Sequence, residues 1–60
     1  MEIFDPVPEE GKSYTTIEGH TIKVQEYVED IDGSYVVCVD ITDNNQTLEY
    51  DCDQWNNLIE

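Results

Sequence analysis

The dipeptide Asp32-Gly33 separates two runs that are rich in Val, Ile and Tyr, residues 21–28 and residues 34–42. An Asp-Gly pair supplies the positive φ angles that the central residues of a tight hairpin turn need. Because β-branched and aromatic side chains suit a pleated, half-buried surface, both runs are predicted to be strands. The sequence therefore predicts an antiparallel hairpin in which Tyr27-Val28 faces Tyr35-Val36.

Alternation along these runs predicts which side chains enter the core. Ile22, Val24 and Val28 fall on one face of the first strand. Glu26 interrupts that face, so we expect either a β-bulge that turns it outward or a bend in the strand. The second run is almost continuously apolar and is predicted to be the central, most buried strand.

Further strands are predicted on both sides of this hairpin. Residues 13–17 form a short run before a turn at Glu18-Gly19. The Asp43-Asn44-Asn45 segment is predicted to be a turn, because Asn tolerates left-handed backbone. Alternation in the run that follows, residues 46–50 and Asp51, places two side chains inward and three outward: Leu48 and Tyr50 inward, and Thr47, Glu49 and Asp51 outward.

The C-terminal segment predicts a short helix. Asp51 and Gln54 have the spacing of a capping box, in which each side chain bonds a backbone N–H of the other residue. Asp53 lies where its negative charge suits the helix dipole. Helical spacing then places three apolar residues on one face, which is expected to cover the sheet: Trp55, Leu58 and Ile59.

The N-terminal segment differs in composition from the rest. Residues 1–11 contain Pro6 and Pro8 and are predicted to be an extended arm, followed by a single small β-rich domain at residues 12–60. Three apolar side chains are expected to pin the arm to the core: Ile3, Phe4 and Val7. No basic leader begins the sequence and no segment approaches the ~20 apolar residues of a membrane span, so we expect a cytoplasmic protein.

Four segments follow one another as in small barrels: Gly11-Lys12-Ser13-Tyr14, Gly19-His20-Thr21-Ile22-Lys23-Val24, Asp32-Gly33-Ser34-Tyr35-Val36-Val37, and Trp55 with Leu58-Ile59. Over residues 11–59 the chain resembles the small SH3-like β-barrel domains of phage and mobile-element proteins. We expect a mainly β (α+β) fold, either such an antiparallel barrel or meander of four to five short strands with a short C-terminal helix, or an open antiparallel sheet with the helix packed across it. Barrels of this kind often bind nucleic acid or peptides.

The charge of the chain restricts its partners. Fifteen acidic residues stand against two lysines, which gives a net charge of -13. Such a surface repels nucleic acid and acidic lipid, so we expect no direct nucleic acid and no membrane as partners. The expected partner is a basic protein surface whose usual ligand is a phosphate backbone. The charge also exceeds the magnitude of about 2–8 that suffices to keep a small domain soluble.

The first functional hypothesis is therefore a non-enzymatic phage or mobile-element inhibitor that mimics DNA. Outward side chains of a strand recur about every 6.8 Å, which is twice the rise of about 3.4 Å per nucleotide in one DNA strand. Two acidic groups are predicted to contact the partner: Glu49, Asp51 and Asp53, and around the hairpin Glu26, Glu29, Asp30 and Asp32. Three aromatic residues are expected to add apolar contact if they are exposed: Tyr27, Tyr35 and Trp55.

The acidity of the chain also agrees with two different hypotheses. In the first, the chain is a structural or regulatory interaction module. Such a module binds a protein through a strand edge or through the Ile3-Phe4 arm, and its charge serves only solubility. In the second, the charge is an adaptation to a highly saline habitat.

Catalytic and metal-binding chemistry is not predicted. His20 is the one histidine and is expected to be a solvated turn residue without a nucleophile beside it, so no catalytic residue and no cofactor are predicted. The acidic residues around Asp32-Gly33 do not fit a calcium loop, because the first ligand position falls on Val28. Cys38 and Cys52 are expected to be reduced thiols packed as small hydrophobes, with a disulfide as the alternative.

Overall fold

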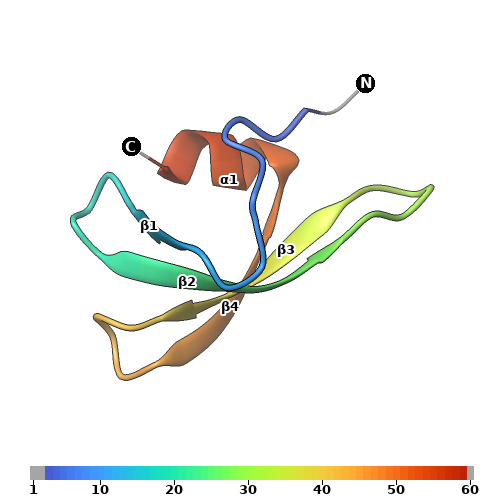
Figure 1. Ribbon diagram of the computed structural model, residues 1–60. Helices are drawn as coiled ribbons and strands as arrows, with labels where there is room; N and C mark the ends of the chain where they lie inside the picture. Colours follow the sequence, from blue (N-terminus) through green and yellow to red (C-terminus); the bar gives the residue numbers. More distant parts are fainter. Residues whose placement is uncertain (1–2, 60) are drawn as a thin grey trace.

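A computed structural model describes residues 3–59 as a four-stranded antiparallel sheet followed by a helix (Figure 1). The strands are hydrogen-bonded in the order of the sequence, β1-β2-β3-β4. The elements have the following bounds: β1 (Ser13–Thr15), β2 (Thr21–Val28), β3 (Tyr35–Asp40), β4 (Gln46–Asp51) and α1 (Cys52–Leu58). Within the described residues, no helix has the length and apolar character needed to cross a membrane.

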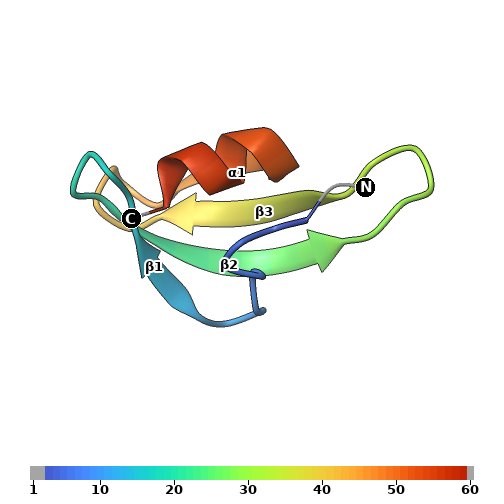
Figure 2. The same ribbon diagram turned by 90° about the horizontal axis from the view of Figure 1, so that it is seen from above.

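The sheet is open, with β1 and β4 as its edges, and α1 lies over one face (Figures 1 and 2). The predicted mainly β meander with a short C-terminal helix is confirmed, in the open-sheet architecture rather than as a closed barrel. The chain beyond the helix returns to β1 instead of to β4. Thr16 forms an antiparallel bridge with Ile59, and the Ile17 N–H donates to the Leu58 carbonyl at 2.8 Å.

A β-bulge interrupts the pairing of β2 with β3. Val24 lies opposite Cys38, but Glu26 lies opposite Val37, so Gln25 is the extra residue of β2. The prediction of a bulge that turns Glu26 outward is confirmed, and the Glu26 side chain is exposed.

The bulge also reverses the faces of the residues that follow it. Residues directly opposite each other in a sheet share a face, and Tyr27 lies opposite the buried Val36. Tyr27 therefore packs against the core, while Val28, opposite Tyr35, lies on the other face. The predicted inward position of Val28 is wrong, because the extra residue shifts the alternation by one position.

The two hairpin connections differ in how well they were predicted. Asn44 and Asn45 both have positive φ, 54° and 56°, which confirms a turn at these residues. In the other connection, the Gly33 N–H donates to the Asp30 carbonyl at 3.2 Å, so the turn covers Asp30–Gly33 within residues 29–34. The expected tight turn centred on Asp32-Gly33 is wrong, although Tyr27-Val28 faces Tyr35-Val36 as predicted.

The helix begins with the predicted capping box. The Asp51 Oδ1 accepts the Gln54 N–H at 2.8 Å, and the Gln54 Oε1 accepts the Asp51 N–H at 3.0 Å. Trp55 on α1 is fully buried and meets Tyr14 of β1 edge to face, with ring centroids 5.1 Å apart. The core under the helix consists of Phe4, Ile22, Val24, Val36, Cys38, Cys52 and Trp55.

The N-terminal arm lies beside α1 over the same face of the sheet (Figure 2). Phe4 is buried and contacts Tyr27 edge to face at 5.1 Å. Ile3 and Val7 are 66% and 58% exposed, so the expectation that they pin the arm is wrong. Pro8 is also buried. Backbone groups of the arm supply further anchors: for example, the Pro6 carbonyl accepts the Trp55 Nε1–H at 2.6 Å.

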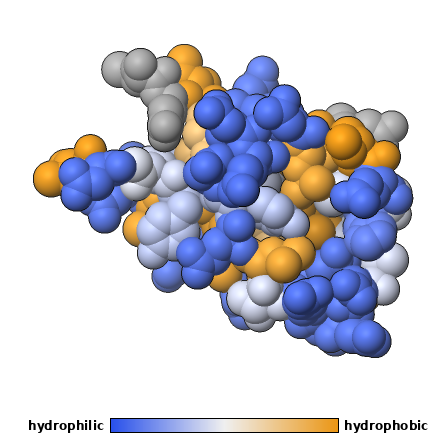
Figure 3. All heavy atoms as spheres, turned by 180° about the vertical axis from the view of Figure 1, so that it is seen from behind, coloured by the Kyte–Doolittle hydropathy of each residue, from blue (hydrophilic) through white to orange (hydrophobic). Residues whose placement is uncertain are grey.

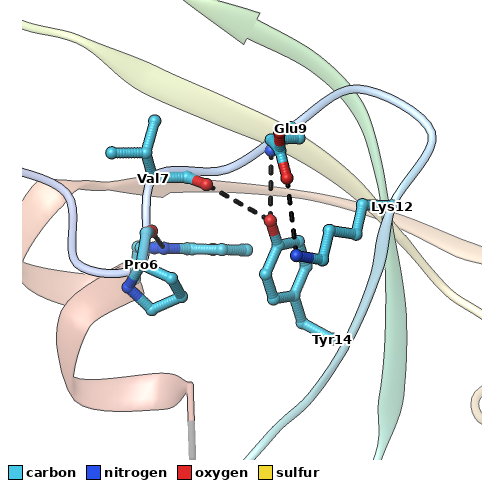
Figure 4. A network of polar contacts seen from close by, with 6 residues as sticks. Pro6, Val7, Glu9, Lys12 and Tyr14 are labelled. Carbon is cyan, nitrogen blue, oxygen red and sulfur yellow. Dashed lines mark hydrogen bonds and ion pairs between the residues drawn. The ribbon is translucent and has the colours of Figure 1, made fainter.

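Tyr14 holds the next part of the arm (Figure 4). Its hydroxyl donates to the Val7 carbonyl and accepts the Glu9 N–H, both at 3.2 Å. Lys12 pairs with the Glu9 carboxylate at 3.4 Å and lies 5.4 Å from the centre of the Tyr14 ring. The arm is therefore fixed to the domain along its length by hydrogen bonds to α1 and to Tyr14.

Candidate functional site

The face of the sheet that points away from α1, called the outer face below, carries most of the carboxylates of the strands. Strand register and burial define its members, since residues opposite one another share a face. From β2, β3 and β4 these residues are Lys23, Glu26, Val28, Tyr35, Val37, Val39, Thr47, Glu49 and Asp51.

Carboxylates lie on both sides of an apolar strip on the outer face. Val37 of β3 has Glu26 opposite it on β2 and Glu49 opposite it on β4. Adjacent strands are about 4.8 Å apart, so these two acidic positions are separated by about 9.6 Å across the sheet. In sequence, Glu26 was grouped with the hairpin and Glu49 with β4, and the structure instead places them in one row.

The apolar strip runs along β3. Tyr35 is 37% exposed, and Val37 and Val39 are half-buried. The prediction that this segment is the central, most buried strand is confirmed: β3 is an inner strand and has more buried residues than the other strands, although only its side facing α1 is fully covered. Near the end of the strip, Lys23, Val39 and Ile41 line a shallow hollow of about 380 Å³. Figure 3, the view from behind, shows hydrophobic patches between hydrophilic side chains.

Few cations balance these carboxylates. Within residues 3–59, the ion pairs join Lys12 to Glu9 and His20 to Asp40, so neither involves an acidic residue of the outer face. Lys23 is the lysine of the outer face, opposite Val39. The outer face is therefore an anionic surface with an apolar centre, which favours binding of cationic groups.

The hairpin acids form a second acidic group next to this face. Glu29, Asp30 and Asp32 are exposed in the connection between β2 and β3. Asp30 has a structural role, because its Oδ1 accepts the Asp32 N–H at 3.3 Å. Ile31 lies between these acidic residues and is 99% exposed.

Three predicted contact residues lie elsewhere. Asp53 belongs to α1, which covers the opposite face of the sheet, so the acidic line of β4 ends at Asp51. Trp55 is fully buried, and Tyr27 is half-buried and packs on the core side of the sheet. Both were expected to contact a partner only if they are exposed. Trp55 does not meet this condition, and Tyr27 meets it only in part. Tyr35 is the exposed aromatic residue of the three.

One interaction was missed from the sequence. His20 Nδ1 and Asp40 Oδ2 are 2.9 Å apart, and the Asp40 side chain is buried. The hydrogen bond to Asp40 raises the pKa of His20, and the same bond lowers the pKa of Asp40. The Asp43 N–H donates to Asp40 Oδ1 at 3.1 Å. The pair therefore joins the turn before β2 to the turn after β3.

Alternation could have shown that Asp40 needs a partner. Asp40 follows Val36 and Cys38 at every second position, so alternation places it on the buried side, where a carboxylate requires a partner. His20 is the one histidine of the chain. The pair has no nucleophile in the described contacts, and among the described residues no group of three His, Cys, Asp or Glu side chains is placed to hold a metal ion.

Both cysteines are buried thiols, as the sequence predicted. Burial raises the pKa of the Cys38 thiol to about 11. The Cys52 Sγ donates to the Ile3 carbonyl at 3.0 Å and so contributes to holding the arm.

Comparison of the chain with protein families, curated proteins and solved structures gives no match. What the structure defines is therefore a class of architecture: a small, strongly acidic β-sheet domain with one helix-covered face and one anionic outer face.

Proposed function

We propose that this chain is a non-enzymatic binding protein that occupies the basic nucleic-acid site of another protein, as a DNA mimic inhibitor encoded by a phage or mobile element does. The observation that carries the proposal is the outer face. Glu26 and Glu49 flank β3, and no ion pair within residues 3–59 neutralises them. A nucleic-acid site offers the Lys and Arg side chains that such a surface lacks.

Strand geometry supports this proposal. Along β4, Glu49 and Asp51 are about 6.8 Å apart, and across the sheet Glu26 adds a second acidic position. Fixed carboxylates on a sheet meet a cationic groove with less loss of side-chain freedom than a disordered acidic tail would. The net charge of -13 also speeds association with a basic partner.

The test reverses charge where no structural hydrogen bond depends on it. The double variant Glu26→Lys/Glu49→Lys changes the net charge by the same amount as the control Glu10→Lys/Glu18→Lys, whose positions are exposed and off the outer face. Asp51 and Asp30 are left intact, since one caps α1 and the other holds a turn.

The tagged chain is used to isolate its partner from a lysate of the encoding organism or its host at low salt. The purified partner is then loaded with fluorescently labelled duplex DNA. We expect the wild-type chain and the control variant to release the DNA, and the Glu26→Lys/Glu49→Lys variant to need at least about tenfold more protein. Release that is equal for all three chains would contradict the outer face as the mimic, and no release by the wild type would contradict the proposed function.

A second candidate function rests on the free edge of β4. Among the described residues, β4 pairs only with β3, so its other edge offers backbone groups to an added strand. The arm is less suited to this role, because Phe4 is buried. Hydrogen exchange in the complex separates the candidates: strand addition protects the amides of β4, whereas charge contact at the outer face leaves their exchange unchanged.

A further inference from the structure

Ile31 is the most exposed large apolar side chain among the described residues. It is 99% exposed and lies in the connection between β2 and β3, among exposed acidic residues. In both ribbon views this connection extends away from the sheet and helix (Figures 1 and 2). The tip of the hairpin thus presents a single apolar group within an acidic surround formed by Glu29, Asp30 and Asp32.

The turn itself does not require an isoleucine. Its hydrogen bonds run from the Gly33 N–H to the Asp30 carbonyl and from the Asp32 N–H to the Asp30 side chain. The positive φ of 136° is taken by Gly33. Ile31 occupies the second position of this turn, which accepts most residue types. Polar residues, Gly and Pro dominate turns, so local structure gives no reason for a β-branched apolar side chain here.

We propose that Ile31 is an anchor that inserts into an apolar pocket bordered by Lys and Arg on the protein partner. The inference rests on the proposed function for the basic character of that partner, and it adds the apolar pocket. Charge complementarity specifies the rim, because carboxylates precede and follow Ile31 in the turn. A β-branched side chain is stiff at χ1, so little rotamer freedom is lost when it is buried.

The chain offers a matched control at the opposite end of the sheet. Ile17 is 64% exposed in the turn after β1 and is followed by Glu18. Ile17→Ser therefore removes an exposed isoleucine beside a carboxylate, as Ile31→Ser does. Since Ile31 is almost fully exposed, Ile31→Ser is expected to leave the thermal unfolding midpoint unchanged, which shows that the variant folds.

The experiment is calorimetric titration of the purified partner, isolated with the wild-type chain, at several salt concentrations. We expect Ile31→Ser to weaken binding by about tenfold or more at every salt concentration, because loss of an apolar contact does not depend on screening. Glu29→Gln/Asp32→Asn is expected to flatten the dependence of log Kd on log salt concentration. Ile17→Ser is expected to change neither quantity.

The outcomes separate this inference from the proposed function. If Ile31→Ser binds like the wild type while Glu26→Lys/Glu49→Lys does not, the anchor is refuted and the outer-face proposal stands. If Ile31→Ser weakens binding while the double reversal does not, the anchor stands and nucleic-acid mimicry by the outer face is refuted. A wild-type chain that retains no basic protein overturns both.

Discussion

A buried carboxylate at the end of β3 is satisfied by two partners from different turns. Asp40 accepts hydrogen bonds at both oxygens, from His20 and from the Asp43 backbone. From its sequence neighbours, which form a turn, His20 was predicted to be a solvated residue. The contact depends on long-range register, which sets Ile22 opposite Asp40, and no local pattern around His20 encodes that register.

Stability is predicted to depend on pH through this pair. The pKa of His20 in the folded protein is raised above 6.5. Its contribution to the free energy of unfolding is therefore full below pH 6.5 and is lost as the pH rises through the pKa of the folded state. The pKa of Asp40 in the folded protein is lowered below 3.8. Its contribution to the free energy of unfolding is therefore full above pH 3.8 and is lost as the pH falls through the pKa of the folded state. The thermal midpoint is therefore expected to fall as pH rises above 6.5.

Glu18 and Asp43 also raise the pKa of His20, so both residues are left unchanged in the variant that tests this prediction. His20→Gln removes the titrating group while it retains a hydrogen-bonding side chain. Melting curves of this variant are expected to be independent of pH over the range in which the wild type loses stability. A parallel decline in both proteins would show that another group is responsible.

At the scale of elements, local signals predicted structure well wherever a few adjacent residues determine it. The capping box depends only on Asp51 and Gln54, and the Asn44-Asn45 turn only on its own backbone. The bulge was predicted, but the shift of Val28 to the other face that it causes was not. The candidate outer face was predicted residue by residue on β4 and missed as a whole, because the row joining Glu26 to Glu49 exists only in the assembled sheet.

The capping box predicts a measurable contribution to stability. Asp51→Ala removes the acceptor for the Gln54 N–H, and Asp51→Asn keeps an acceptor while it makes the same change in net charge. We expect Asp51→Ala to be less stable than Asp51→Asn by about 1 kcal/mol in urea unfolding. Equal stability of the two variants would mean that water replaces the cap without loss.

The arm is predicted to be an integral part of the core. Phe4→Ala leaves a cavity beside Tyr27 and is expected to cost about 3–5 kcal/mol. Val7→Ala, at a residue that is 58% exposed, is expected to change stability by less than about 0.5 kcal/mol. Urea unfolding followed by the fluorescence of the buried Trp55 measures both. Similar small effects would show that the arm detaches without unfolding the sheet.

At the scale of the whole molecule, charge opposes the compact fold. A net charge of -13 on 60 residues brings like charges together when the chain folds, and this self-repulsion is relieved by screening. The Debye length falls from about 30 Å at 0.01 M salt to about 3 Å at 1 M.

The thermal midpoint is therefore expected to rise with sodium chloride. Differential scanning calorimetry over that range of salt tests the expectation, and sucrose at matched osmolality controls for general exclusion effects. An unchanged midpoint would show that the acidic residues are already neutralised by bound cations.

The docking of the arm on α1 also has a consequence for synthesis. Hydrogen bonds between these segments join residues 49 to 53 positions apart. The arm leaves the ribosome long before residues 52–56, which hold it, have emerged. Until then Phe4 and the apolar side of the sheet have no cover, and the core closes only after nearly all of the described chain is outside the exit tunnel. Nascent chains stalled before α1 should therefore be the forms that chaperones and proteases recognise.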